Sequence, residues 1–364
     1  STGAEVLEGL KNEHPAVSLL LNYRQLAKLK STYADGLQEC IAEDGRIHST
    51  FNQTEARTGR ISSLEPNLQN IPVRTAEGRR LREYFNAPAG RVLCDADYSQ
   101  IELRVLASMS GDANMINAFG SGTDIHTVTA SQVFGLPQDM ITPELRSRAK
   151  AVNFGIVYGI GAFSLSKDIG VTRAEADRYI KSYLAAYPGV AAYMEKAIED
   201  AKKNGYVTTL YGRRRYIPEL SNSNGNMRAF GERVARNAPI QGTAADIIKI
   251  AMIKVSRSLK EEFPTARLIL QVHDELIVEC DERDAEGVCA LLETKDKLER
   301  AKAYRRGAFR KNLVRGEGVN EGFIRLHGKH LPQPYGRGVS ALKAAARHYG
   351  GEPRSCGERR GGKY

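Results

Sequence analysis

Two apolar runs near residue 270 place the strongest constraint on how this 364-residue chain folds. The runs LILQV (268–272) and ELIVE (275–279) are separated only by His273 and Asp274. A two-residue connection between β-forming runs predicts an antiparallel hairpin. The tip carries His-Asp followed by Glu275, where Asn-Gly would be the common turn choice. We therefore expect acidic side chains at the end of two paired strands.

A second acidic strand end lies earlier in the chain, in the run RVLCDADYSQ (91–100). A single acid there, such as Asp95 or Asp97, usually only solvates or caps a turn. Two acidic strand ends in one sheet would instead bring carboxylates together. Mg²⁺ prefers oxygen ligands and needs only one or two carboxylates when substrate phosphates supply the rest.

The remaining hydrophobic pattern predicts an α+β chain whose strands are separated by a long helical insertion. Helical periodicity dominates from Gln100 to about Lys203, and Gly205 indicates a helix end. The other expected elements are one or two helices in 15–43, a strand in 46–51, a capping box at 172–175 opening a helix that ends before Pro188, a hairpin in 206–220, helices at 226–237 and 241–261, and a helix at 282–293.

Composition excludes several classes of protein. Hydrophobic residues make up 41% of the chain, enough for a real core, and no apolar run approaches the roughly 18 residues of a membrane span. The N-terminus has no basic and apolar signal regions, and the missing initiator Met indicates a fragment of a longer chain. The five cysteines favour reduced thiols over a disulfide framework: Cys40, Cys94, Cys280, Cys289 and Cys356.

The net charge of +10 is concentrated at one end of the chain. Residues 294–364 hold 18 Lys and Arg against 6 Asp and Glu, whereas 1–293 hold 35 against 37. The body must therefore bind any nucleic acid through local basic patches and not through its overall charge. Because the segment 294–364 also lacks apolar periodicity, we expect it to be poorly ordered, with at most short helices at 296–306 and 340–348.

A stripe of cations and aromatic rings follows one side of the helix predicted at 145–159. Arg146, Lys150, Phe154 and Tyr158 are each four residues apart, and each step turns only about 40° around a helix. Cations for phosphates and a ring for a base or sugar suit a nucleoside triphosphate. The alternative is a helix with two solvated cations and two core aromatics, which the stripe alone favours.

Two further segments are rich in amides and guanidinium groups. The segment FNQTEARTGRISSLEPNLQNIP (51–72) contains Arg57 and Arg60, and RVARNAPIQGTAAD (233–246) spaces Arg233, Asn237 and Gln241 four apart. Such groups can contact the minor-groove acceptors shared by all base pairs. Alone, the first segment is typical of a surface loop, and amides on a helix are usually only exposed polar residues.

Taken together, these segments resemble a known family. DYSQIELR (97–104), RSRAKAVNFGIVYG (146–159) and QVHDE (271–275) resemble motifs A, B and C of family A DNA polymerases. TGRISSLEPNLQNIP, YGRRRYIP and NAPIQGTAADIIK are similar to the same family in the same order. The resemblance runs from about Ser1 to about Glu293 and is strongest to bacterial polymerases of the Bacillus large-fragment kind.

The resemblance implies roles for these residues. Asp97 and Asp274, with the main-chain carbonyl of Tyr98, would bind two Mg²⁺ ions, and Glu275 would be an accessory catalytic carboxylate. The nucleotide site would comprise Arg146 and Lys150 on the triphosphate, His126 beside it, Phe154 on the sugar and base, Tyr158 at the template position, Glu102 against a 2′-hydroxyl, and Gln100. Lys150 would also act in catalysis. The DNA contacts would be Arg60, Arg233, Asn237, Gln241 and His273.

The resemblance also implies a right-hand architecture with an antiparallel palm sheet, helical fingers and only the end of the thumb. We expect thumb helices at 1–43, palm at 44–125 and 237–293, and fingers at 126–236. Residues 294–364 depart from the family, which puts the closing palm strand and catalytic competence in doubt.

The implied reaction is template-directed addition of deoxynucleotides to a primer 3′-hydroxyl, in replication or repair. The implied partners are primer–template DNA and deoxynucleoside triphosphates, for a monomer that binds no membrane, in the bacterial cytoplasm at the nucleoid. Two alternatives differ in class. A single-subunit RNA polymerase is disfavoured by Glu102 at the sugar position, and a DNA-binding remnant without activity is favoured only by the short thumb and the unusual end.

Overall fold

The computed structural model of the chain describes residues 3–72, 75–82, 84–304 and 326–327. The chain divides into two compact units. The described part of the first unit is 3–52 with 62–72, 75–82 and 84–88. The described part of the second is 53–61, 89–304 and 326–327.

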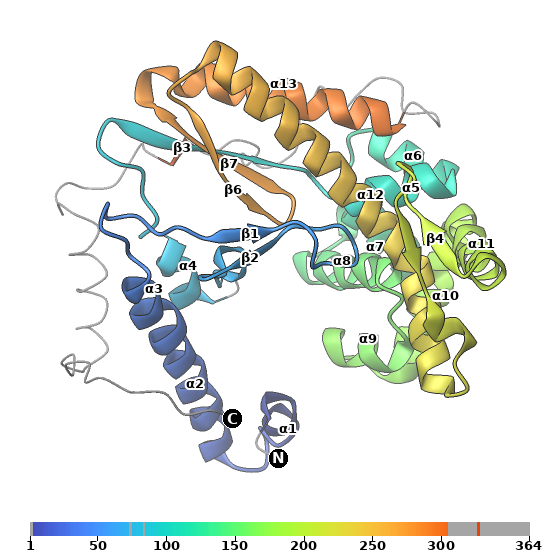
Figure 1. Ribbon diagram of the computed structural model, residues 1–364. Helices are drawn as coiled ribbons and strands as arrows, with labels where there is room; N and C mark the ends of the chain where they lie inside the picture. The colour runs from blue at the N-terminus through green and yellow to red at the C-terminus, as the bar shows by residue number, and fades with distance from the viewer. Residues whose placement is uncertain (1–2, 73–74, 83, 305–325, 328–364) are drawn as a thin grey trace. The chain divides into compact units, whose positions relative to one another are not determined.

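The first unit is built around a long helical segment near the N-terminus. Its elements are α1 (Ala4–Gly9), α2 (Pro15–Lys28), a π-helical stretch (Leu29–Asp35), α3 (Gly36–Glu39), β1 (Thr50–Asn52), β2 (Ser62–Leu64), a 3₁₀ turn (Leu68–Asn70) and α4 (Ala76–Arg82). The helix predicted in 15–43 is confirmed as the unbroken run from α2 to α3 (Figure 1). No residue of α2 is buried within the described chain. The strand predicted at 46–51 begins only at Thr50.

A four-stranded antiparallel sheet is the centre of the second unit. Its strands are β3 (Arg91–Asp97), β6 (Arg267–Val272), β7 (Glu275–Asp281) and β8 (Leu326–His327), in the order β6-β7-β3-β8. All three pairings are antiparallel. The hairpin predicted from the two apolar runs is therefore confirmed as β6 and β7. The α+β class with an antiparallel sheet is confirmed as well.

Helices pack on one face of this sheet. In Figure 1, α12 (Gly225–Glu262) and α13 (Ala285–Tyr304) lie along the strands β3, β6 and β7. The apolar side chains of the strands meet these helices in one core, which includes Val278, Val288 and Leu292. The packing against α12 and α13 holds the sheet in place. The ends of the strands are therefore not needed for this packing and can carry polar side chains.

The C-terminal segment meets the sheet at the edge of β3. Leu326 and His327 pair with Cys94 and Leu93. The helix α13 runs to Tyr304, past the end predicted at residue 293. Residues 294–304, part of the segment predicted to be poorly ordered, belong to α13 and include most of the helix predicted at 296–306. The rest of that prediction, with the helix at 340–348, falls on 305–325 and 328–364, which lie outside the described residues.

Helices make up most of the second unit between β3 and β6. They are α5 (Ile101–Ser110), α6 (Ala113–Gly120), α7 (Ile125–Phe134), α8 (Pro143–Val157), α9 (Ala162–Ile169), α10 (Arg173–Ala186) and α11 (Pro188–Asn204), followed by the hairpin of β4 (Tyr206–Thr208) and β5 (Arg214–Tyr216). Short 3₁₀ turns lie at Gln138–Met140, Pro218–Ser221 and Glu282–Asp284. The capping box at Thr172 and Glu175, the helix end at Gly205 and the hairpin are confirmed.

The two helices predicted at 226–237 and 241–261 are one helix, so that prediction is wrong. α12 continues for 38 residues through Pro239. Proline removes one helical hydrogen bond and usually ends or kinks a helix. Here many side chains of α12 on both sides of Pro239, among them Ala235 and Ile240, are buried in the unit. Tertiary packing of this face keeps the helix continuous despite the local break.

The four described cysteines are free thiols, as predicted; Cys356 lies outside the described residues. Cys94 and Cys280 are buried with their sulfur atoms 3.5 Å apart. None of the described helices is long and apolar enough to cross a membrane.

Candidate active site

The sheet brings the predicted acids together at one pair of strand ends. Asp97, the last residue of β3, lies opposite Glu275, the first residue of β7. One residue further out, the Tyr98 N–H donates to the carbonyl oxygen of Asp274 at 3.1 Å. Asp97, Asp274 and Glu275 are all half-buried. The three acids that the sequence placed at strand ends are therefore neighbours.

Both strand ends turn through a residue in the left-handed conformation. His273 at the hairpin tip has a φ of 53°, and Gln100 after β3 has a φ of 55°. Residues other than glycine adopt this region rarely, and mostly in tight turns. The Gln271 side chain donates to the His273 carbonyl at 2.5 Å, which ties the tip to its own strand. Gln100 is also the residue before α5, so β3 passes directly into the helix that carries Glu102.

The donor set at these strand ends fits a magnesium ion. Asp97 and Asp274 supply hard carboxylate oxygens and Tyr98 a main-chain carbonyl, the donor types that Mg²⁺ takes. Among the residues that the structure describes, no group of three or more His, Cys, Asp or Glu side chains is arranged to hold a metal. A site with two carboxylates would depend on phosphate oxygens and water for its remaining ligands.

The predicted stripe of α8 forms as the spacing indicated. Thr142 caps the helix and Pro143 occupies its first turn. The Lys150 ammonium lies 5.9 Å from the centre of the Phe154 ring. The rings of Phe154 and Tyr158 are stacked, with centres 6.4 Å apart and planes 16° apart. Arg146 and Lys150 are exposed, so the stripe presents two cations followed by two rings.

Glu102 joins this stripe to the segment 53–61. The Tyr158 hydroxyl donates to the Glu102 carboxylate at 3.0 Å, and the Arg60 guanidinium donates to the other carboxylate oxygen. The Glu102 side chain is only 8% exposed. Burial, together with the charge of Glu102, raises the pKa of the Tyr158 hydroxyl to about 12. The hydroxyl is therefore a permanent donor that holds Glu102 in place at neutral pH.

Arg146 is paired with Asp124, a residue that the sequence did not single out. Nε of Arg146 lies 2.8 Å and Nη2 3.0 Å from the two oxygens of Asp124. Burial raises the pKa of the Asp124 carboxyl, but hydrogen bonds from Arg146 and Thr127 outweigh it, and the pKa is lowered overall. Asp124 also caps α7 through Thr127. Its only sequence signal is that capping position, which gives no hint of Arg146.

His126 lies inside the unit beside Phe154, with ring centres 5.8 Å apart. The side chain is 2% exposed, so its ring is covered in this conformation. Burial, opposed by the charge of Asp124 and reinforced by those of Arg146 and Lys150, lowers the pKa of His126 to about 4. The ring is therefore a neutral imidazole at physiological pH.

The predicted DNA contacts on α12 lie along one side of the helix. Arg233 is exposed, whereas Asn237 and Gln241 are half-buried. The Arg233 guanidinium carbon lies 5.8 Å from the centre of the Phe230 ring. The four-residue spacing seen in the sequence is thus realised on a single helix.

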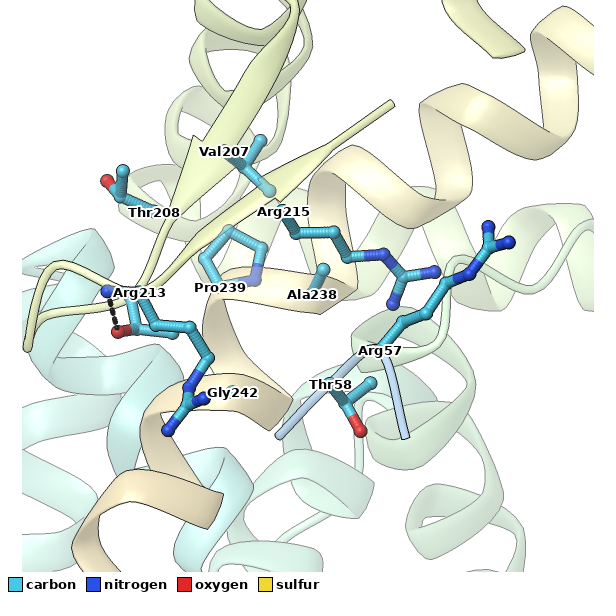
Figure 2. A pocket seen from close by; sticks show the side chains of 10 residues that line it. Arg57, Thr58, Val207, Thr208, Arg213, Arg215, Ala238, Pro239 and Gly242 are labelled. Carbon is cyan, nitrogen blue, oxygen red and sulfur yellow. Dashed lines mark hydrogen bonds between the residues drawn. The ribbon is translucent and has the colours of Figure 1, made fainter. Parts of the chain in front are cut away.

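A small basic pocket lies beside α12, between the β4–β5 hairpin and the segment 53–61. Figure 2 shows Arg57 and Arg215 reaching to the same side of this pocket, while Arg213 points to the other. Arg213 is bound by Asp246, with Nε 2.9 Å from the carboxylate. Burial, followed by the charge of Arg57, lowers the pKa of Arg215. Arg57 stands out in the sequence as part of a polar segment, but nothing in the sequence predicts the pocket.

The comparisons with known proteins bear on the whole arrangement. The sequence profile of DNA polymerase family A matches residues 1–305. The chain belongs to DNA polymerase family A. The match passes Glu293 and ends at the C-terminal end of α13.

Relatives in the family are named DNA polymerase I. The chain is 51% identical over 294 residues to the protein from Geobacillus stearothermophilus and 53% identical over 289 residues to that from Bacillus subtilis. These alignments cover 80% and 79% of the chain but only 34% and 33% of the relatives. The chain therefore spans about a third of the length of the curated relatives it matches. The predicted resemblance to bacterial enzymes of the Bacillus kind is confirmed.

A solved structure in the family has the same fold. The POL domain of Pol1 from M. smegmatis, in complex with DNA primer–template and dNTP, matches with a TM-score of 0.78 and 46% sequence identity. The match covers 84% of this chain and 53% of that one. The expected fold of a family A polymerase domain fragment is confirmed, while the boundaries of palm, fingers and thumb and the roles of single residues stay predictions.

Proposed function

We propose that the chain is the polymerase part of a DNA-directed DNA polymerase, which adds deoxynucleotides to a primer 3′-hydroxyl as a template directs. The observation that carries the proposal is the juxtaposition of Asp97 and Asp274, joined by the Tyr98–Asp274 hydrogen bond. Membership of the family and the relatives' name, DNA polymerase I, support it. Its proposed partners are primer–template DNA and deoxynucleoside triphosphates. We propose that it acts as a monomer at the bacterial nucleoid.

Asp97, Asp274 and the Tyr98 carbonyl would hold two Mg²⁺ ions, which supply acidification of the primer hydroxyl and neutralisation of phosphate charge. The chain's own side chains would do the rest. Arg146 and Lys150 bind the triphosphate, and Lys150 donates a proton to the departing pyrophosphate. Phe154 packs on the sugar and base.

Glu102 and its partners would set the choice of sugar. A carboxylate fixed by Tyr158 and Arg60 occupies space that a ribonucleotide's 2′-hydroxyl would need. Arg60, Arg233, Asn237, Gln241 and His273 would contact the primer–template duplex. Amides and guanidinium groups suit minor-groove acceptors that are common to every base pair, and so suit a polymerase that must accept any sequence.

Primer extension tests the proposal directly. With a primer–template, the four dNTPs and Mg²⁺, the chain should extend the primer, and Asp97→Asn or Asp274→Asn should slow extension about a thousandfold or more. Asp95→Asn is the matched control, because it removes the same charge from the same strand two residues away from the strand end. Binding of duplex should persist in all three variants.

Two results of this experiment would contradict the proposed function. A chain that binds duplex but never extends a primer would be the DNA-binding remnant considered above. Extension at the wild-type rate by Asp97→Asn or Asp274→Asn would refute the catalytic assignment of these acids.

A further inference from the structure

A buried chain of hydrogen bonds leads from His126 into the helical part of the second unit. The side-chain amide nitrogen of Asn153 lies 3.0 Å from His126 Nδ1. The Thr129 hydroxyl donates to Asn153 Oδ1 at 3.2 Å and lies 3.1 Å from the Tyr187 hydroxyl. Asn153, Thr129 and Tyr187 are fully buried and His126 is 2% exposed. The hydrogen bonds that link these four side chains therefore lie in the protein interior.

The direction of each bond follows from its donors. An amide nitrogen donates and never accepts, so His126 Nδ1 must accept from Asn153. A neutral imidazole carries one proton, which then resides on Nε2. Thr129 gives its single hydrogen to Asn153, so the Tyr187 hydroxyl donates to Thr129. Three residues, from α7, α8 and the junction of α10 and α11, thereby fix one ring nitrogen as an acceptor.

We propose that Asn153 is a positioning residue that locks His126 as the Nε2–H tautomer, so that the ring offers a fixed N–H donor to phosphate oxygen in the nucleotide site. The inference rests on the proposed function, because that function assigns Arg146 and Lys150, which act electrostatically on the ring, to the triphosphate. Without Asn153 the imidazole would exchange its proton between both nitrogens and present an acceptor for part of the time.

The surroundings of the ring make this lock effective. The charged groups that act on His126 are Asp124 from the start of α7 and Arg146 and Lys150 from α8. Burial and the two cations keep the ring neutral, since its pKa is lowered to about 4. A neutral ring has one donor and one acceptor, and a partner that can only donate determines which nitrogen accepts. The amide of Asn153 is such a partner.

Nitrogen-15 NMR of the full chain tests the tautomer without nucleotide or activity. The chain has seven histidines, and the His126 signals are identified by their loss in His126→Gln. We expect an unprotonated Nδ1 and a protonated Nε2 from pH 6 to pH 8. A protonated Nδ1, or equal exchange between the two forms, would overturn the proposal even if every variant below failed to fold.

Asn153→Asp reverses the partner's chemistry. An ionised carboxylate only accepts, so it would draw a proton to Nδ1 and stabilise the imidazolium. The pKa of His126 should rise well above 4 in the same NMR titration. Asn114→Asp is the matched control, since Asn114 donates to the Ala186 carbonyl on the surface and does not touch the ring. An unchanged His126 titration in Asn153→Asp would refute the contact.

Kinetics separate a positioning role from a merely structural one. Asn153→Ala should raise the KM for dNTP about tenfold, the loss of one good hydrogen bond, with a smaller change in kcat. His126→Ala should do the same, and the double variant should be no worse than either single one. Additive effects in the double variant would sink the link between Asn153 and His126. If the tautomer is as stated but dNTP leaves the His126 signals unmoved, the nucleotide role of the ring is wrong.

Discussion

His126 makes the free energy of unfolding depend on pH in a definite direction. Its pKa in the folded chain is lowered to about 4 by burial, against about 6.5 in an unfolded chain. Between these values the unfolded state binds more protons than the folded state. Stability is therefore fully present above about pH 6.5 and is lost as the pH falls towards 4.

The size of the effect can be measured with one substitution. Urea unfolding of the wild type should lose about 3 kcal/mol between pH 7 and pH 4 through His126 alone. His126→Gln should be less stable at pH 7 but should lack this part of the pH dependence. His48→Gln, at an exposed histidine, should keep it. Equal pH slopes in wild type and His126→Gln would contradict the burial argument.

At the residue scale, the sequence predicted those parts of the site that depend on local spacing. Arg146, Lys150, Phe154 and Tyr158 form a stripe because four-residue spacing alone places them on one side of α8. Asp124 and Asn153 escaped prediction because their partners lie 22 and 27 residues away in the chain. A buried amide inside a helix carries no sequence signal until the neighbouring helix is known.

At the element scale, turn chemistry was predictive and proline was misleading. The β6–β7 hairpin follows from a two-residue connection, and the capping box at Thr172 from residues three apart. Both are local rules. The break predicted near Pro239 failed because burial of α12 on both sides of the proline, a property of the whole unit, outweighs one lost hydrogen bond.

Gly242 shows how closely α12 approaches the β4–β5 hairpin. A Cβ at this position would lie 2.6 Å from Thr209 Cγ2 and 3.3 Å from the Thr58 carbonyl oxygen. Gly242→Ala should therefore destabilise the chain by about 1–2 kcal/mol, since overpacking outweighs the gain in helix propensity. Thermal unfolding followed by circular dichroism would measure the difference.

Gly120 at the end of α6 provides the control. A Cβ there meets nothing within 4 Å, so Gly120→Ala should leave stability unchanged or raise it slightly. If both alanine variants melt at the wild-type temperature, the hairpin and helix are not packed as tightly as the distances indicate.

At the scale of the whole molecule, charge and fold are separated along the chain. Residues 305–364 contain 14 Lys and Arg against 4 Asp and Glu, while 1–304 contain 39 of each. The net charge of +10 thus lies entirely beyond Tyr304, where the match to the family profile also ends. Composition showed this asymmetry at once, whereas the pairing of Leu326–His327 with β3 left no readable pattern.

Deleting 305–364 should change the salt dependence of DNA binding more than its structural preference. Binding through cationic side chains weakens with salt in proportion to the number of phosphates neutralised. Fluorescence anisotropy from 50 to 300 mM salt should give a shallower slope for the deletion variant, with preference for primer–template over single strands retained. Unfolding of the shortened chain would instead show that Leu326–His327 are essential to the sheet, and an unchanged slope would exclude this segment from DNA binding.

If Arg146 binds the triphosphate as proposed, its pairing with Asp124 makes nucleotide binding an exchange of one anion for another. A phosphate that takes the guanidinium must displace a carboxylate already bound through both its oxygens. A ligand with a single phosphate offers little more charge than Asp124 and gains little by the exchange. A triphosphate offers several times more charge and, in the proposed site, would also contact Lys150. The Arg146–Asp124 pair would thereby favour nucleoside triphosphates over monophosphates, whichever base they carry.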